Sequence, residues 1–383
     1  MCHLPWVGMD ISPQGEFKPC CKYTDVLAKD LDEFLTSPMR RKMQEDFLAG
    51  REHEGCARCW RDEAAGLPSK RELDNQYIFE NQTPEYDGIK VLGMTFGNTC
   101  NLACRTCSSY ASSRWRHEAN AVKDRLPELT RFGHNQFYRS EQFINKLLSN
   151  LKGVRHIEFA GGEPFFADPV AHHQILTHII NNEDASQISL HYITNLTKMP
   201  SPDTIKFHWS HFKKVDVQLS IDGIYKKFEY MRWPGRWTSV TLNLARYKEL
   251  KRLEGINLQL SISHTVSMLN VFDLPEFLEW CELEQLPIPY LGLVTRPDIY
   301  SITVLPKEAK ERIEQHFKRY SKYQELLDPV VHAMWAKDDS ELLDNTIKHV
   351  KILDTKREQS FAETFKNTYN ILGERCQTLY QLY

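Results

Sequence analysis

The positions of the cysteines constrain this chain more than any other feature. Eight of its ten cysteines lie within the first 107 of 383 residues. Clustered cysteines in a reducing compartment indicate metal ligation rather than disulfide bonds. The N-terminus lacks the basic and apolar regions of a signal peptide, and no apolar run approaches the roughly 20 residues needed to cross a bilayer. We therefore expect a cytoplasmic metal-binding protein with no membrane partner.

Charge and composition narrow the class of function further. The chain has 48 Lys and Arg against 51 Asp and Glu, which gives a net charge of −3 with histidine neutral. Proteins that bind phosphate backbones usually carry a clear positive excess, so nucleic acid is not favoured as a partner. A hydrophobic fraction of 41% is typical of a folded globular chain and excludes a disordered one.

Strand and helix signals alternate from about residue 89. We expect four helices, over Leu31–Ala49, Tyr138–Leu151, Val170–Asn181 and Asp273–Cys281. Six short runs rich in β-formers predict strands, namely Ile89–Phe96, His156–Ala160, Ile188–Thr194, Val215–Ile221, Leu258–Thr265 and Tyr290–Val294. Such alternation indicates a parallel sheet with right-handed crossovers. Six strands are too few for a closed eight-stranded barrel, so we predict an α/β open or partial barrel.

Three regions differ in composition. Residues 1–85 combine turns with two groups of cysteines and predict a small metal-stapled domain. Residues 86–305 hold the strands and helices of the partial barrel. Residues 306–383 are rich in balanced charges and poor in Gly and Pro, which predicts a helical C-terminal extension.

Three cysteines with the spacing C-x3-C-x2-C follow the first predicted barrel strand. They are Cys100, Cys104 and Cys107. Three thiolates can hold three corners of an iron–sulfur cube and leave one iron open, as a catalytic metal position requires. Zinc is the alternative, although catalytic zinc usually takes His ligands and no His follows at a suitable spacing. In barrels, chemistry is normally placed at the carboxyl ends of the strands.

Polar motifs also end the next three predicted strands. Gly161-Gly162-Glu163 follows the second strand, and paired glycines allow a ligand to approach the backbone closely. Asn195 ends the third strand, in Thr194-Asn195, and Ser220 ends the fourth, in Ser220-Ile-Asp-Gly. Arg232 comes twelve residues after Ser220 and could hold a carboxylate with two parallel hydrogen bonds. Each motif alone is usually structural, but together they favour a ligand at one rim of the sheet.

The ordered set of these motifs resembles the radical S-adenosylmethionine superfamily, in particular its members with SPASM or twitch auxiliary domains. The resemblance covers about residues 89–270. It implies a partial (β/α)6 TIM-like barrel and a catalytic [4Fe–4S] cluster on the three cysteines. It also implies S-adenosylmethionine chelated to the open iron, with contacts from the Gly-Gly-Glu segment, Asn195, Ser220 and Arg232. Thr106 stands where many relatives carry an aromatic residue.

A second set of cysteines lies in residues 1–85. The pattern is Cys2-x12-Gly-x4-Cys20 followed by Cys56-x2-Cys59, which supplies four thiolates. On chemistry alone, a structural zinc site is possible. The pattern resembles a twitch domain placed before the barrel, which implies a second, fully ligated [4Fe–4S] cluster that moves electrons. Cys21 is ambiguous, because it could replace Cys20 or be a buried neighbour.

The resemblance implies an enzyme of oxidoreductase type that cleaves S-adenosylmethionine reductively to a 5′-deoxyadenosyl radical, which abstracts a substrate hydrogen. It further implies a flavodoxin- or ferredoxin-type reductant. We favour a small-molecule substrate such as a sugar, aminocyclitol or amino-acid derivative, with a ribosomally made peptide as the alternative. A zinc-stapled scaffold without activity is a remote third reading. His264, Arg296 and Asp298 follow later strands and are candidates for substrate binding or proton transfer, or for structural pairing.

Overall fold

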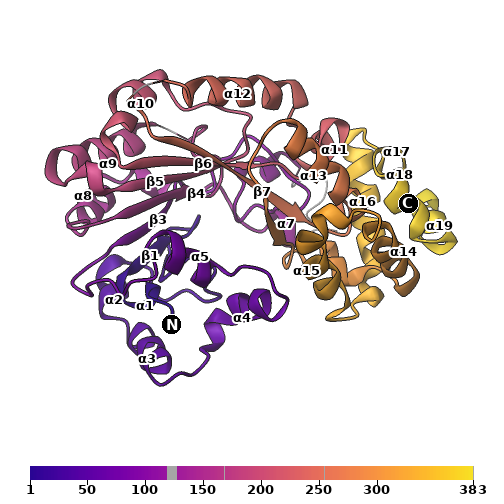
Figure 1. Cartoon of the computed structure of the whole chain (residues 1–383), viewed down its shortest axis with the longest axis horizontal. Helices are drawn as coiled ribbons and strands as arrows, with labels where there is room; N and C mark the ends of the chain where they lie inside the picture. Colours follow the sequence, from indigo (N-terminus) through magenta and orange to yellow (C-terminus); the bar gives the residue numbers. More distant parts are fainter. Residues whose placement is uncertain (119–126, 168, 254, 383) are drawn as a thin grey trace.

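The computed structural model describes residues 1–118, 127–167, 169–253 and 255–382. One eight-stranded sheet organises the chain, with the strand order β2-β1-β3-β4-β5-β6-β7-β8 (Figure 1). The six strands from β3 to β8 are all parallel, and each pairs with the next in sequence. The sheet does not close on itself, since β2 and β8 are its two edges. The predicted α/β partial barrel is therefore confirmed.

All six predicted barrel strands are present within a residue or two of their expected ends. Two further strands come from the N-terminal segment and were not predicted. The strands are β1 Gly8–Ile11, β2 Phe17–Lys18, β3 Val91–Thr95, β4 His156–Ala160, β5 Ser189–Thr194, β6 Lys214–Ser220, β7 Leu258–Val266 and β8 Tyr290–Leu293. β1 runs parallel to β3, and β2 is antiparallel to β1.

The two faces of the sheet differ in polarity. In β5, Leu190 and Tyr192 are fully buried and belong to the main hydrophobic core, whereas His191 between them is only partly buried. The same alternation holds in β6. Asp216 of this strand lies in register with His191, and its Oδ2 is 2.6 Å from Nδ1 of the histidine ring. Strand side chains alternate between faces, so one face packs on helices and the other presents polar groups to the interior of the partial barrel.

The helices fall into three groups. Those of the N-terminal segment are α1 Leu4–Val7, α2 Leu31–Thr36, α3 Pro38–Leu48, α4 Ala57–Ala64 and α5 Lys70–Tyr77. Those of the barrel are α7 Pro127–Thr130, α8 Glu141–Leu148, α9 Pro169–Asn182, α10 Pro202–Phe207, α11 Tyr225–Met231, α12 Trp237–Leu250 and α13 Leu274–Leu283. The C-terminal ones are α14 Lys307–Phe317, α15 Gln324–Trp335, α16 Leu343–Arg357, α17 Phe361–Thr364, α18 Lys366–Ile371 and α19 Glu374–Leu382.

The N-terminal segment lies at the end of the sheet formed by β2 and β1 (Figure 1). The single helix predicted over Leu31–Ala49 is wrong, because it is broken between α2 and α3. Ser37 has an extended backbone and accepts a hydrogen bond from the backbone of Arg40, while Pro38 occupies the first helical position of α3. A proline is favoured there and cannot continue a preceding helix, so the Ser-Pro pair starts a new one.

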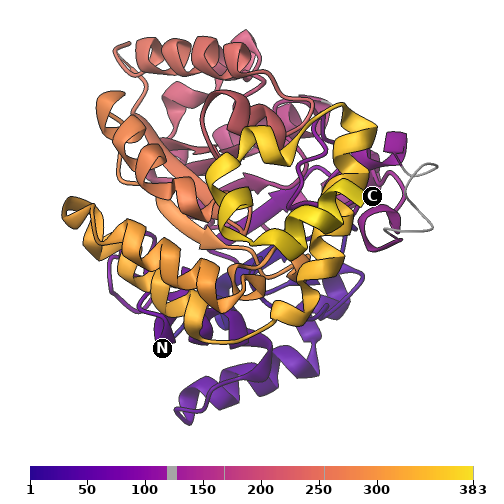
Figure 2. The same cartoon turned by 90° about the vertical axis from the view of Figure 1, so that its right-hand side faces the viewer.

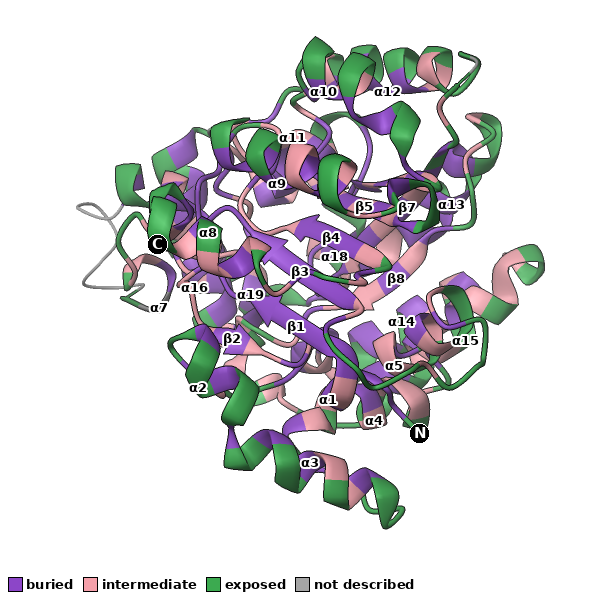
Figure 3. Ribbon diagram, turned by 90° about the vertical axis from the view of Figure 1, so that its left-hand side faces the viewer, coloured by how far each residue is buried: buried purple, intermediate pink, exposed green. Residues whose placement is uncertain are grey.

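The C-terminal helices gather beside the β7 end of the sheet in Figures 1 and 2. Thr346 of α16 donates a hydrogen bond to the carbonyl of Ile299, and Thr368 of α18 donates one to that of Leu269. The extension is helical as predicted and shares the main core with the barrel. Figure 3 shows buried strands at the centre and exposed outer helix faces. No helix in the described part of the chain is long and apolar enough to cross a membrane.

Candidate functional site

The cysteine loop follows β3, at the carboxyl end of the parallel strands. Its backbone is fixed by the segment after α11: the amide of Ala103 donates to the carbonyl of Trp233 at 2.7 Å, and the amide of Arg105 donates to that of Met231 at 2.8 Å. Within the loop, the Cys107 amide donates to the Cys104 carbonyl at 3.1 Å. The loop is thus held against the chain on both sides of Cys104.

The thiols of this loop affect one another's ionisation. Burial raises the pKa of Cys100 far above its ordinary value, and the neighbouring Cys104 and Cys107 raise it further. Burial and Cys104 likewise raise the pKa of Cys107 to about 12. Thiols that oppose each other's ionisation in a buried site become stable thiolates only beside positive charge. A bound metal centre supplies such charge.

The donor set fits an iron–sulfur cluster better than a disulfide. All ten cysteines are free. Among the residues the structure describes, no three His, Cys, Asp or Glu side chains are arranged to hold a metal ion. The fit therefore rests on the chemistry of three thiols close in sequence, one buried and two partly buried, with polar groups from the neighbouring strand ends, and not on preformed metal geometry.

Gly161 and Gly162 form a close turn beside the loop. Both have a positive φ, and a Cβ on Gly162 would meet the carbonyl oxygen of Thr99 at 2.2 Å. The Glu163 amide donates to that same carbonyl at 2.9 Å. Only glycine permits the chain that follows β4 to approach Thr99, the residue before Cys100, this closely.

The carboxylate of Glu163 is fully buried and turned toward the end of β5. It accepts hydrogen bonds from the Thr194 hydroxyl at 2.7 Å and from the Asn195 amide at 2.6 Å. Burial raises the pKa of Glu163 to about 7, although these hydrogen bonds oppose the shift. The side chain thus ties the end of β4 to the end of β5, and these contacts occupy its carboxylate.

Asn195 is brought to the cysteine loop. Its side-chain amide donates to the Asn101 side chain at 3.0 Å and lies 4.0 Å from the Cys100 sulfur. Its carbonyl oxygen accepts hydrogen bonds from the amide and hydroxyl of Thr197. Ser220 lies at the end of β6, partly buried and in register with Ser263 of β7.

Arg232 stands next to the loop with one donor unused. It pairs with Asp222 at 2.9 Å, and both side chains are almost wholly buried. Its Nε has no hydrogen-bond partner among the described residues. Burial raises the pKa of Cys104, while Arg232 and Arg357 lower it. The structure therefore places two arginine charges near this thiol, one of which sequence reasoning did not find.

Arg105 is a second residue that the sequence did not reveal. It lies between Cys104 and Thr106, with its side chain fully buried, and pairs with Asp354 of α16. It also donates to the carbonyl of Tyr230 at 3.2 Å and to the side chain of Gln359 at 3.0 Å. No local signal could have found this, because the partners lie more than a hundred residues away in sequence.

The N-terminal thiols form a separate group. Burial raises the pKa of Cys2 to about 12, with further contributions from Cys56 and Cys59. Burial also raises the pKa of Cys20 strongly, and Cys21, Cys2 and Cys59 add to it. Each of the four predicted ligands thus has its pKa raised by another of them or raises another's, but among the described residues no three such side chains are arranged to hold a metal ion.

Cys21 faces another environment. It is exposed, and among the charges that act on it, Lys70 lowers its pKa, and Glu158 and Asp10 raise it. A shallow recess beside it is lined by these three charged side chains together with Cys20. Of the two adjacent cysteines, Cys20 is therefore the one whose charge couples to Cys2 and Cys59.

The later strand ends give a different picture. His264 is buried, with Nδ1 hydrogen-bonded to the carbonyl of Ile221 at 2.9 Å and Nε2 3.2 Å from the Asn270 amide. Burial lowers the pKa of His264 to about 4, so the ring is neutral near pH 7. Arg296 and Asp298 are exposed, beyond the end of β8. The structure satisfies His264 with internal partners and does not bring these three side chains together.

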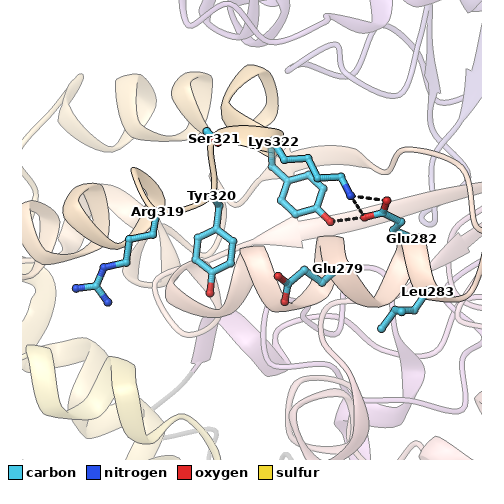
Figure 4. Close-up of a pocket in the computed structure, with 8 residues that line it drawn as sticks. Glu279, Glu282, Leu283, Arg319, Tyr320, Ser321 and Lys322 are labelled. Carbon is cyan, nitrogen blue, oxygen red and sulfur yellow. Dashed lines mark hydrogen bonds and ion pairs between the residues drawn. The ribbon is translucent and has the colours of Figure 1, made fainter.

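A surface hollow lies apart from all of these residues (Figure 4). It is bordered by α13 and the turn after α14. Lys322 and Tyr323 both bind the carboxylate of Glu282 across it. None of the predicted site residues lines this hollow, so we assign it no part in the chemistry.

Comparison with known proteins gave limited similarity. No protein-family model and no curated protein matches the chain. Among solved structures, "Native anSMEcpe with bound AdoMet" shares 17% identity at a TM-score of 0.42, covering 59% of this chain and 58% of that one. The same protein "with bound AdoMet and Cp18Cys peptide" gives 17% identity and a TM-score of 0.41, covering 59% and 58%.

A third similar structure is that of Streptococcus suis SuiB bound to S-adenosylmethionine, with 14% identity and a TM-score of 0.36 over 61% of this chain and 44% of that one. The chain thus spans less than two thirds of the length of these proteins. At these values the likeness assigns no function by itself, and the function rests on the residues described above.

Proposed function

We propose that the chain is a radical S-adenosylmethionine enzyme with a [4Fe–4S] cluster on Cys100, Cys104 and Cys107. One observation carries this proposal. Buried Cys100 and partly buried Cys104 and Cys107 lie at the carboxyl end of the first barrel strand, beside the glycine turn at Gly162 and an arginine with an unused donor. Three protein ligands leave one metal position open for a ligand with its own donor atoms.

The surrounding residues suit the methionyl part of the cofactor. Arg232 keeps its charge because Asp222 pairs with it, and its unpartnered Nε can donate to a carboxylate. The Gly161–Gly162 turn exposes backbone polar groups at the same rim, where an amino group can bind. Asn195 and Ser220 offer neutral polar groups suited to a ribose. These assignments are testable residue by residue.

When bound, the cluster supplies the electron that cleaves S-adenosylmethionine to a 5′-deoxyadenosyl radical able to abstract a substrate hydrogen. The chain's contribution is position and exclusion of water. Packing of the loop against Trp233, Met231 and the C-terminal helices buries Cys100 and leaves Cys104 and Cys107 only partly exposed. The polar inner face of the sheet, with His191 and Asp216, lies where a substrate would be held.

We further propose that Cys2, Cys20, Cys56 and Cys59 bind a second [4Fe–4S] cluster in a domain of residues 1–85. Four thiol ligands leave no open iron, so this cluster would carry electrons, delivered by a flavodoxin- or ferredoxin-type reductant. The charges of Cys56 and Cys59 act on Cys2, and those of Cys2 and Cys59 act on Cys20, which supports the assignment; Cys21 also acts on its neighbour Cys20.

Anaerobic reconstitution followed by iron and sulfide counting tests both sites. Two cubanes give about eight irons per chain. Cys20→Ala should lower the count to about four, and the matched variant Cys21→Ala should keep it near eight. The reverse result would assign the ligand to Cys21, and zinc alone in the wild-type protein would refute both clusters.

Changing Cys100, Cys104 and Cys107 together to Ala should abolish formation of 5′-deoxyadenosine from S-adenosylmethionine under reducing conditions. Persistence of that product would refute the catalytic role of the loop. The N-terminal cysteines are unchanged in this variant, so about four irons should remain and report that the rest of the protein is folded.

The substrate class is decided by assay. A small molecule and a ribosomally made peptide both need a polar recess beside the cofactor. A peptide occupies one of the similar structures, which makes a peptide pool the practical first screen. Incorporation of substrate deuterium into 5′-deoxyadenosine identifies the class that donates the hydrogen, and transfer from neither class would refute the hydrogen-abstraction step.

A further inference from the structure

The C-terminal extension contributes to the cysteine site as well as to the core. Ala103, next to Cys104, packs with Trp115 and with Leu353 of α16 in one fully buried apolar cluster, and Trp233 lies at its margin. Arg357, one turn after Leu353, ends the same helix. The last turn of α16 is therefore seated directly on the cysteine loop.

The Arg357 side chain is rigidly held. Its Nε and Nη2 donate to the two carboxylate oxygens of Glu118 at 3.1 and 2.9 Å, and neither side chain is more than 2% exposed. The guanidinium carbon lies 4.9 Å from the ring centre of Trp115 and 5.0 Å from that of Trp233. A guanidinium fixed by two parallel hydrogen bonds and two aromatic rings has little freedom left to lose on binding a ligand.

One donor of this rigid group is unused. Nη1 of Arg357 is buried and has no hydrogen-bond partner among the residues that the structure describes. Buried donors are usually satisfied, so an orphaned guanidinium N–H indicates a missing acceptor. The Trp233 ring that this guanidinium contacts belongs to the residue whose carbonyl binds the amide of Ala103, next to Cys104, so the unused donor lies beside the cysteine loop.

The local charges leave room for an anion. Arg105, Arg232 and Arg357 are each paired with one carboxylate, those of Asp354, Asp222 and Glu118. Each positive charge is therefore matched by one negative charge. An anionic group bound at this site would add negative charge, and the unpartnered Arg232 Nε and Arg357 Nη1 are donors that can meet it.

We infer that Arg357 of the C-terminal extension is a binding residue of the cysteine-loop site, and that its Nη1 donates to an anionic group bound there. The shared chemistry is a negative charge at Cys104, carried by the thiolate-ligated cluster or by the carboxylate of S-adenosylmethionine. This inference rests on the proposed function. It assigns a ligand contact to a region of the chain that carries no sequence motif.

Three variants test the inference on the reconstituted full chain. Arg357→Met removes the charge, and Arg357→Lys keeps the charge but not the planar fork. Arg375→Met is the matched control, since it removes an arginine of the same extension whose side chain is 79% exposed. Iron content and thermal unfolding report whether each variant is intact.

Two readouts separate the two anions. If Nη1 donates to the cluster, Arg357→Met should lower the equilibrium constant for one-electron reduction of the cluster about tenfold. This corresponds to a reduction potential about 59 mV lower, measured by electron paramagnetic resonance without S-adenosylmethionine. If it meets the carboxylate, the dissociation constant for S-adenosylmethionine should rise about tenfold to hundredfold, with no such loss for the decarboxylated analogue. The control should match the wild type in both.

Unchanged potential and affinity in a variant with full iron content would overturn the inference. If Arg357→Met does not fold, Arg357→Lys decides by the same two readouts, with smaller changes expected. Failure of both to fold would assign Arg357 to the structure alone and overturn it as well. A wild-type protein that takes up no cluster would instead refute the proposed function, so the two failures are distinguishable.

Discussion

The buried pair between Arg105 and Asp354 predicts a large and specific loss of stability. Arg105 is fully buried within the cysteine loop, and Asp354 is 2% exposed on α16. The Asp354 carboxylate also accepts hydrogen bonds from the Phe361 amide at 2.7 Å and the Tyr380 hydroxyl at 2.6 Å. We predict that Asp354→Asn lowers the free energy of unfolding by about 3–5 kcal/mol, because it leaves a buried guanidinium without its counter-charge.

The matched control is Asp344→Asn. Asp344 begins the same helix, pairs with Arg375 and is 45% exposed, so its loss should cost no more than about 1 kcal/mol. Urea unfolding of the apo protein under reducing conditions measures both variants. Iron uptake should also fall in Asp354→Asn, because Arg105 adjoins Cys104. If the two variants lose equal stability, the argument that α16 anchors the cysteine loop by a buried ion pair is wrong.

Two further predictions follow from the sheet. Gly162→Ala should abolish iron retention on the cysteine loop, because a Cβ would meet the Thr99 carbonyl at 2.2 Å. The control is Gly50→Ala, since Gly50 has a similar positive φ but open space around it. This variant should lower the free energy of unfolding by only about 1 kcal/mol and leave the iron content unchanged. Burial alone would raise the pKa of Glu158, but Lys70 and nearby histidines lower it to about 2. The pKa of Glu158 in the folded protein lies below the ordinary 4.5, so the ionised carboxylate stabilises the folded state fully above pH 4.5. As the pH falls toward 2, this contribution to the free energy of unfolding is lost by up to ~1.4 kcal/mol per pH unit. Glu158→Gln should flatten the urea-derived stability profile between about pH 5 and 3, and an unchanged slope would contradict this.

Local pattern was sufficient for the architecture. The strands β3 to β8 were predictable because each is a short run of β-formers between turns, and parallel pairing followed from the helices between them. β1 and β2 were not, since Gly8–Ile11 is short and its pairing partner β3 lies about eighty residues away. The break at Pro38 was readable in principle, because a Ser before a Pro is a common helix start.

The sequence alone predicted the candidate site, from the spacing of Cys100, Cys104 and Cys107 and from the polar residues that end consecutive strands. Both features are local, because the cysteine spacing and the alternation of a strand can each be recognised within a few neighbouring residues. Only the tertiary structure decided which partners complete the loop. Arg105 meets Asp354, and Arg357 meets Glu118, across 249 and 239 residues of chain. Contacts of this kind arise from packing of α16 on the barrel, and no local sequence pattern encodes them.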